Sequence, residues 1–378
     1  MALLIERQIR RRIEERLGKG KAIILTGPRR VGKTVLIQTI KAGYPGNSIF
    51  LNGEDITTVE LLERKSAENY KALFASYDLL IIDEAQAIPE IGKVLKLIVD
   101  EVKGLDLIAT GSSAFDLSNL LGEPLTGRKF HFDLFPFSQG ELSAQESRIE
   151  TYQRLDERLV FGTYPEVALM SDFESKKEYL NEIVKSYLLK DILAFERIKN
   201  PVLLNKLLQL LAYQVGSEVS LEELARQLGV HRATVERYLD LLSKVFVIFQ
   251  VGGYSSNLRK EVVKSSKWYF YDNGIRNAVI GDYSLFHTRR DQGQLWENYL
   301  FSERVKRNSY LGLRADIFFW RTYDQQEIDM IERKDGQLAA FEFKLTKKKD
   351  KPPLFFARNY PDVPFQVVTR ENYLDFIL

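Results

Sequence analysis

The sequence contains no cysteine and only three histidines among its 378 residues. The absence of cysteine excludes disulfides, thiol nucleophiles and thiolate metal sites, and it fits a reducing compartment. The three histidines, His131, His231 and His287, are far apart in the sequence, which argues against a zinc site. We therefore expect a cytoplasmic protein without zinc.

Long apolar runs and an excess of one charge are also missing. No stretch approaches the ~18 apolar residues of a membrane span, so we expect no membrane partner. The 54 basic and 52 acidic residues give a net charge of +2, so any face that binds nucleic acid must be local. Residues 5–17 mix arginine with glutamate, unlike a signal or transit peptide. We predict an amphipathic helix there, packed on the first domain, with its arginines in solvent.

The stretch at residues 27–34 is the most informative motif. It reads G-P-R-R-V-G-K-T and matches the phosphate-binding loop pattern G-x-x-x-x-G-K-[ST]. An apolar run at 22–25 predicts a strand before it, and residues 35–40 can begin a helix after it, which is the setting that the loop needs. Backbone N–H groups of such a loop bind nucleotide phosphates. The predicted nucleotide-binding residues are Gly27, Pro28, Arg29, Arg30, Val31, Gly32, Lys33, Thr34 and Val35, with Lys33 at the β- and γ-phosphates and Thr34 on Mg²⁺.

A second apolar run, at 79–82, ends in Asp83 and Glu84. Such runs are typical of strands in a parallel sheet that is covered on both faces, and open α/β sheets bind ligands at the carboxyl ends of their strands. We predict that Asp83 holds Mg²⁺ through water and that Glu84 is the base that orients the attacking water. Further strands at 48–51, 105–113 and 129–134 predict a three-layer, mostly parallel α/β domain.

The order of these motifs resembles a bacterial and archaeal family of AAA+ ATPases. The resemblance rests on the phosphate loop, on Ile81-Ile82-Asp83-Glu84-Ala85-Gln86, on Ala109-Thr110-Gly111-Ser112-Ser113, on Leu125-Thr126-Gly127-Arg128, and on the stretches 132–138 and 162–165. It implies ATP and Mg²⁺ as ligands, Lys33 and Glu84 in catalysis, and Thr110 or Ser112 as a polar sensor. It also implies that Arg128 stabilises charge, in cis or on a neighbouring subunit of a homo-oligomer. A surface arginine is an equal alternative.

Residues 220–242 predict a helix-turn-helix. Ser220 begins a capped helix that ends at Gly229, and a second helix follows from Arg232. Arg232, Thr234 and Arg237 would then face DNA. Strands at 245–251 and 267–271, with a turn at Gly252-Gly253, would form the wing. Eight basic residues stand against five acids between 221 and 268, so packing on the ATPase domain is an equal alternative to DNA binding.

The C-terminal third resembles the PD-(D/E)XK restriction-endonuclease-like fold. Strands at 316–322, 327–331 and 339–344 place Asp329 and the Glu342-x-Lys344 motif on neighbouring strands, and Glu297 matches the upstream helical acid of that fold. Such residues can hold one or two Mg²⁺ ions and activate water. The proline that usually precedes the aspartate is replaced by Ile328. A structural relic whose charges pair with one another is the alternative. Lys347-Lys348-Lys349 could touch a nucleic-acid backbone.

Together these patterns predict an α/β P-loop AAA+ domain followed by three smaller parts. The boundaries are 1–142 for the ATPase domain, 143–200 for a helical connector with a long helix at 176–197, 201–285 for the winged helix and 286–378 for the endonuclease-like domain. We predict a Mg²⁺-dependent ATPase whose nucleotide state drives the C-terminal region, with DNA as a candidate partner. The alternatives are a nucleotide switch that recruits a protein and an ATP-regulated nuclease.

Overall fold

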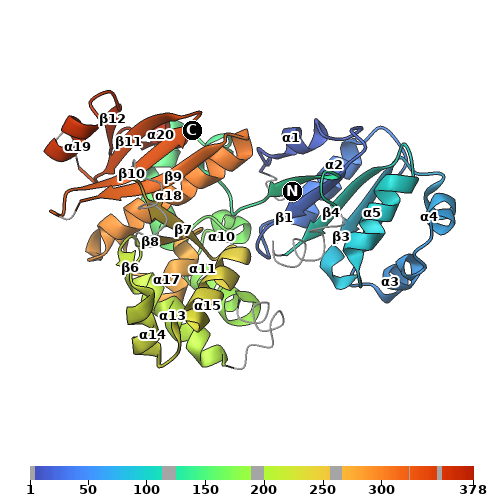
Figure 1. Cartoon of the computed structure of the whole chain (residues 1–378), viewed down its shortest axis with the longest axis horizontal. Helices are drawn as coiled ribbons and strands as arrows, with labels where there is room; N and C mark the ends of the chain where they lie inside the picture. Colours follow the sequence, from blue (N-terminus) through green and yellow to red (C-terminus); the bar gives the residue numbers. More distant parts are fainter. Residues whose placement is uncertain (1–4, 113–124, 189–199, 256–265, 323, 347–350) are drawn as a thin grey trace. The chain divides into compact units, whose positions relative to one another are not determined.

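The computed structural model describes residues 5–112, 125–188, 200–255, 266–322, 324–346 and 351–378. Contacts divide the chain into two compact units, drawn in Figure 1. The first comprises residues 1–135 together with 244–246, and the second comprises 136–243 and 247–378. Each unit contains its own sheet.

The first unit is built on five parallel strands in the order β2-β3-β4-β1-β5. Their bounds are β1 Ala22–Thr26, β2 Ser48–Asn52, β3 Leu79–Asp83, β4 Asp106–Gly111 and β5 Lys129–Asp133. Every residue of β1 and β3 is buried, as expected for strands that are covered on both faces. The predicted parallel α/β domain is therefore confirmed.

Helices cover both faces of this sheet. Their bounds are α1 Arg10–Glu14, α2 Lys33–Gly43, α3 Ile56–Glu63, α4 Ala67–Phe74, the short η1 Ala85–Ala87 and α5 Ile91–Glu101. Figure 1 shows α2 and α5 on opposite faces. Side chains of α3, α4 and α5 form one core with alternate residues of the strands, such as Ile24 and Ile82. The N-terminal helix is shorter than the predicted 5–17, but Ile9 and Ile13 are fully buried.

The second unit begins with a run of helices and has further helices between and after its strands. Their bounds are α7 Gln139–Ser143, α8 Arg148–Gln153, α9 Leu155–Phe161, α10 Pro165–Leu169, α11 Phe173–Glu182, the π-helical η2 Ile183–Leu188, α13 Pro201–Tyr213, α14 Leu221–Leu228, α15 Arg232–Lys244, α17 Asn273–Ile280, η3 Phe286–Thr288, α18 Gln292–Leu311, α19 Leu354–Asn359 and α20 Tyr373–Ile377. The helix predicted at 176–197 is α-helical only to Glu182, and its end at 189–199 lies outside the described residues. Among the described helices, none is both long and apolar enough to cross a membrane.

One sheet of seven strands runs through the second unit in the order β12-β11-β10-β9-β7-β8-β6. The strands are β6 Glu218–Val219, β7 Ile248–Gly253, β8 Ser266–Phe270, β9 Ala315–Arg321, β10 Glu327–Lys334, β11 Gln337–Phe343 and β12 Phe365–Val368. Strand β7 pairs antiparallel with β8 and parallel with β9. The strands predicted for the wing and for the endonuclease-like part therefore belong to the same sheet.

The turn predicted at Gly252-Gly253 is wrong. Both glycines lie in β7, where Gly252 pairs with Ser266 on one side and Phe318 on the other. Neither glycine adopts the left-handed backbone conformation that would turn the chain. The two helices of the predicted helix-turn-helix are present at the predicted positions. Helix α14 ends at Gly229, whose φ of 66° is left-handed, and α15 begins at Arg232.

Candidate functional site

The phosphate-loop sequence lies between β1 and α2, as its pattern predicts. Gly27 has a φ of 156°, and a Cβ atom there would lie 2.1 Å from the carbonyl oxygen of Leu134. Gly32 has a left-handed φ of 89° and caps α2 without a side-chain hydrogen bond at the helix start. Both positions therefore favour glycine, and no capping side chain takes up the first amides of α2. That is the geometry in which a helix start binds phosphate.

Lys33 is folded into the loop. Its side chain is only 5% exposed, and Nζ donates to the carbonyl oxygens of Gly27 at 2.9 Å and Pro28 at 3.0 Å. Phosphate oxygens would be alternative acceptors for the same ammonium group. The lysine thus lies where a bound polyphosphate would need it.

The two residues predicted to ligate Mg²⁺ are in contact. Thr34 Oγ1 donates to Asp83 Oδ2 at 2.7 Å, and Thr110 Oγ1 donates to the other carboxylate oxygen. A hydroxyl and a carboxylate, completed by nucleotide phosphates and water, are a ligand set that Mg²⁺ uses, so these residues fit the ion. Within the described ranges, no three acidic or histidine side chains are grouped to hold a metal ion by themselves. The phosphates would therefore have to supply part of the coordination.

Glu84 follows Asp83 in a conformation that is rare for residues other than glycine. Its φ is 48°, and its backbone N–H donates to Thr110 Oγ1 at 3.1 Å. The carboxylate accepts a 2.5 Å hydrogen bond from Nε2 of Gln86, which also lies 3.4 Å from Ser112 Oγ. The structure therefore brings the predicted base and the predicted sensor together through Gln86, for which we had predicted no role. Backbone strain of this kind is common at functional sites.

Arg7 is a further residue that the sequence did not identify. We expected the N-terminal arginines in solvent, but Arg7 is 7% exposed. Its two terminal nitrogens donate to the carbonyl oxygens of Val31 at 2.7 Å and Phe135 at 2.6 Å. This guanidinium ties the phosphate loop to the segment that follows β5. The sequence offers one sign that Arg7 is buried. It lies between the apolar residues Ile5 and Ile9 and apart from the arginine run at 10–12.

Arg128 lies at the end of the strands opposite to the phosphate loop. Its carbonyl oxygen accepts from the N–H of Ala22, the first residue of β1, whereas the phosphate loop follows the last. The two ends of β1 are separated by its five residues, a length of roughly 16 Å at ~3.3 Å per residue. The Arg128 side chain donates to Asp100 at 2.6 Å. The structure therefore does not bring Arg128 to the loop of its own chain, and a role on a neighbouring subunit stays a prediction.

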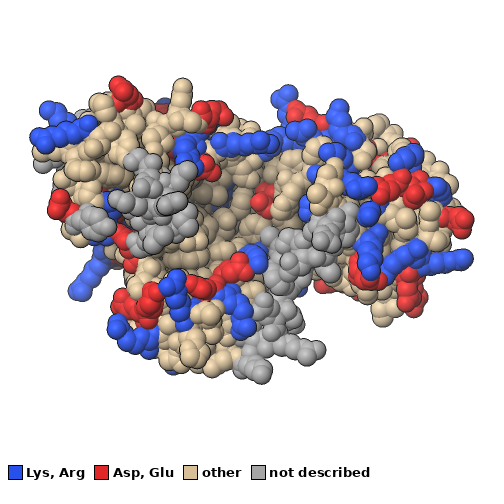
Figure 2. All heavy atoms as spheres, viewed as in Figure 1, with Lys and Arg blue, Asp and Glu red and all other residues tan. Residues whose placement is uncertain are grey.

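The predicted DNA-facing residues lie at the start of α15. Arg232 is exposed, but it pairs with Glu222 and, at 2.8 Å, with Glu236. The Arg237 guanidinium lies 5.6 Å from the ring centre of Tyr238, and Thr234 is half-buried. Figure 2 shows Lys and Arg interspersed with Asp and Glu over this part of the second unit. A DNA phosphate would have to compete with these acids for Arg232.

The four charged residues of the endonuclease-like motif do meet in the second unit. Lys344 Nζ lies 2.6 Å from Glu342 Oε1, and the N–H of Phe343 donates to Asp329 at 2.6 Å. Burial raises the pKa of Asp329 well above its usual range, and the nearby carboxylates of Glu297 and Glu342 raise it further. Burial also raises the pKa of Glu297. Lys347-Lys348-Lys349 lies outside the described residues.

This centre contains two charged residues that the sequence motif does not include. Lys267 on β8 places Nζ 2.6 Å from Glu327 Oε1 and 3.5 Å from Glu297 Oε1. Burial alone would lower the pKa of Lys267, but the charges of Glu297 and Glu327 outweigh it and raise the pKa. We define the carboxylate centre as Lys267, Glu297, Glu327, Asp329, Glu342 and Lys344.

Models of three protein families match successive parts of the chain. Residues 19–143 match a family described as an AAA domain, which agrees with the P-loop fold of the first unit. Residues 152–284 and 292–371 match two families that are each described as a domain of unknown function. The first unit is thus an AAA-type P-loop domain, whereas the winged helix and the endonuclease-like fold stay predictions.

Relatives that align with most of this chain occur in bacteria and archaea. An uncharacterized protein of Mycobacterium tuberculosis is 27% identical over 349 residues, covering 91% of this chain and 75% of the relative. An uncharacterized protein of Methanocaldococcus jannaschii is 25% identical over 363 residues, covering 90% and 79%. Among solved structures, the Thermotoga maritima RuvB Holliday junction branch migration motor aligns at a TM-score of 0.32 and 19% identity, covering 64% of this chain and 88% of that one. The Aeropyrum pernix ORC1 protein in complex with DNA aligns at 0.33 and 14%, covering 75% and 94%. These scores are too low to support conclusions about function.

Proposed function

We propose that this protein is a Mg²⁺-dependent ATPase whose nucleotide state controls its second unit. The observation that carries the proposal is the contact between Thr34 and Asp83 at the mouth of a phosphate loop, with Glu84 next in the chain. A bound Mg²⁺ would neutralise developing charge on the phosphates. Lys33 would bind the β- and γ-phosphates, and Glu84 would orient the attacking water. Ser112, in reach of Gln86, would sense the γ-phosphate.

Titration with a labelled ATP analogue and Mg²⁺ tests the site. Lys33→Ala should lose binding, because the loop loses the ammonium group that we assign to the β- and γ-phosphates. Lys41→Ala, at a half-buried position in the last turn of the same helix, is the matched control and should bind like wild type. If Lys33→Ala binds with unchanged affinity, the assignment of the phosphate loop is wrong.

A nucleotide switch is the second candidate, and one observation favours it. The carboxylate of Glu84 already accepts a hydrogen bond from Gln86, so one of its two oxygens is engaged by the protein itself. In a switch, binding alone would set the position of the second unit and recruit a protein. Turnover measured beside nucleotide-dependent protease sensitivity separates the two. A switch changes its cleavage pattern with ATP while releasing no phosphate.

We also propose DNA as the polymer that the ATPase serves and a homo-oligomer as its assembly. Arg232, Thr234 and Arg237 would contact the DNA, and Arg128 would reach the nucleotide of a neighbouring subunit. Phosphate release with and without single- and double-stranded DNA tests the first idea, because stimulation lost in Arg237→Ala would support it. Arg128→Ala mixed with wild-type chains tests the second: an arginine that acts across subunits should lower the activity of wild-type partners.

A further inference from the structure

The carboxylate centre contains an unusual balance of buried charge. Four carboxylates, from α18, β10 and β11, share it with two ammonium groups. Lys267 is the more deeply placed of the two, with a side chain 4% exposed against 46% for Lys344. Its ammonium also lies 5.3 Å from the ring centre of Phe319. A lysine this deep is costly unless its charge is matched, and Glu297 and Glu327 match it.

Each carboxylate of the centre already has one oxygen engaged. Glu297 Oε1 accepts from Tyr269 at 2.6 Å and lies beside Lys267, and Glu342 Oε1 pairs with Lys344. A Cβ atom at Gly216 would lie 3.2 Å from the same Glu297 oxygen, so the backbone packs against this carboxylate as well. Little room is left beside Glu297 for a hydrated ion.

The donor set does not fit a divalent ion in this arrangement. Mg²⁺ demands near-ideal octahedral geometry, and no three carboxylates among the described residues converge on one point. Oε2 of Glu342 is buried without a hydrogen-bond partner, but one free acceptor is not a coordination site. The ammonium of Lys267 instead stands between two carboxylates, where a cation would otherwise be required.

We propose that Lys267 is the resident cation of the carboxylate centre and takes the place of a divalent metal ion. The centre then holds β8, α18 and β10 together through charge, and it does not assemble a metal-activated water. Removing the lysine side chain should leave the carboxylates of Glu297 and Glu327 facing a space of about one ammonium group. Such a variant should gain a metal site that the wild type lacks.

Counting bound Mn²⁺ by electron paramagnetic resonance tests the proposal on the full-length, nucleotide-free protein. Asp83→Asn is carried in every sample so that the phosphate-loop region contributes no ion. Lys267→Ala should bind one Mn²⁺ per chain more than its parent, and adding Glu297→Gln should abolish the gain. Lys176→Ala is the matched control: Lys176 is 1% exposed but pairs with the single carboxylate of Glu157, so its removal should create no site.

Two results of the Mn²⁺ measurement would overturn the proposal, and DNA cleavage gives a third test. One is a folded Lys267→Ala chain that binds no additional ion. The other result concerns the Asp83→Asn parent itself. If the parent binds an ion and loses it when Glu342→Gln is added, the carboxylate centre already holds a metal ion. Lys267→Gln, which keeps a hydrogen-bonding side chain, serves if the alanine variant does not fold. Plasmid DNA incubated with the wild type and Mg²⁺ or Mn²⁺ should stay intact, and cleavage that disappears in Glu342→Ala would also contradict the account.

Discussion

The side-chain amide of Gln86 donates a 2.5 Å hydrogen bond to Oε2 of Glu84, the acid that we assign to the attacking water. An amide donor occupies one of the acceptor positions of the carboxylate and restrains its orientation. The same amide lies 3.4 Å from Ser112 Oγ, at the end of β4. A change at Ser112 on nucleotide binding could thus alter how firmly Glu84 is held.

Gln86→Ala should raise the rate of ATP turnover. A hydrogen bond to a charged group contributes about 1.5 kcal/mol, so its removal should raise the rate by up to about tenfold. Nucleotide affinity should not change, because Gln86 does not contact the phosphate loop. Gln38→Ala, at an exposed position of α2, is the control. A slower Gln86→Ala enzyme would mean that the glutamine positions Glu84 for catalysis instead of restraining it.

Gly27→Ala should destabilise the first unit and abolish nucleotide binding. The new methyl group would lie 2.1 Å from the backbone oxygen of Leu134, which cannot rotate away as a side chain could. We expect a loss of about 3 kcal/mol in the free energy of unfolding. Gly18→Ala is the control for backbone strain alone, because Gly18 has a φ of 72° and open space around it. Equal losses in the two variants would contradict the close packing of the loop on Leu134.

Arg7→Met should weaken ATP binding with little change in the maximal rate. The guanidinium positions the loop through Val31 and does not reach the water or Glu84. Loss of a charged hydrogen bond of about 1.5 kcal/mol predicts about a tenfold higher KM. Arg7→Lys should keep only part of the ATP affinity, since an ammonium group cannot bond to both carbonyl oxygens as the guanidinium does. Arg11→Met, at a side chain 88% exposed, should bind normally. A fall in kcat alone would place Arg7 in the chemistry instead.

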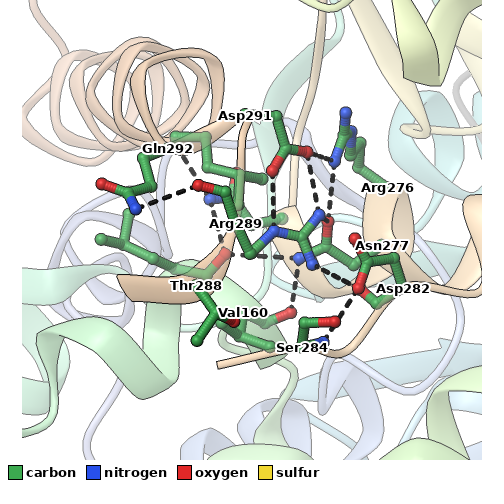
Figure 3. A network of polar contacts seen from close by, with 12 residues as sticks. Val160, Arg276, Asn277, Asp282, Ser284, Thr288, Arg289, Asp291 and Gln292 are labelled. Carbon is green, nitrogen blue, oxygen red and sulfur yellow. Dashed lines mark hydrogen bonds and ion pairs between the residues drawn. The ribbon is translucent and has the colours of Figure 1, made fainter. Parts of the chain in front are cut away.

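Asp291 should make the second unit sensitive to acid. Figure 3 shows it between two buried arginines: Arg289 Nε donates at 2.8 Å, and Arg276 pairs with the same carboxylate. Burial alone would raise the pKa of Asp291, but its hydrogen bonds with Arg289 and the charge of Arg276 lower it to about 2. A lowered pKa stabilises the fold above the unfolded-state pKa of about 3.9, and this stabilisation is lost as the pH falls toward 2.

Asp291→Asn should therefore cost about 3 kcal/mol at neutral pH, because two guanidinium groups lose a shared carboxylate. The difference from wild type should shrink as the pH falls below about 4. Chemical denaturation of both proteins at neutral and acid pH measures it. Asp316→Asn, whose carboxylate is 65% exposed beside Arg333, is the control and should change little. A pH-independent difference would mean that the aspartate acts by packing and not by charge.

The sequence predicted the first unit well because its signals are local. The phosphate loop lies within eight consecutive residues, and apolar runs mark β1 and β3 next to the polar residues at their carboxyl ends. Hydrogen bonds between residues that are far apart in the sequence could not be predicted from such local patterns. Arg7 contacts Phe135 across 128 residues, and the pattern around each of them reveals nothing of the other.

The second unit shows the same limit more strongly. Asp329, Glu342 and Lys344 were found from spacing, because neighbouring strands bring them together. Lys267 was not, since it reaches the centre from β8, a strand that β7 joins to the C-terminal part of the sheet. That parallel pairing of β7 with β9 depends on how the whole unit packs. Gly252 and Gly253 suggested a turn because glycine is common in turns, whereas in this sheet they continue a strand.

The most direct test of the central claim compares ATP binding and phosphate release in wild type and Glu84→Gln. The substitution keeps the size of the side chain and removes its ability to take a proton. We predict that Glu84→Gln binds Mg²⁺-ATP with an affinity close to that of wild type and releases at least about a hundredfold less phosphate in a single turnover. Equal phosphate release by the two proteins, at matched occupancy, would contradict the assignment of this site as the ATPase centre.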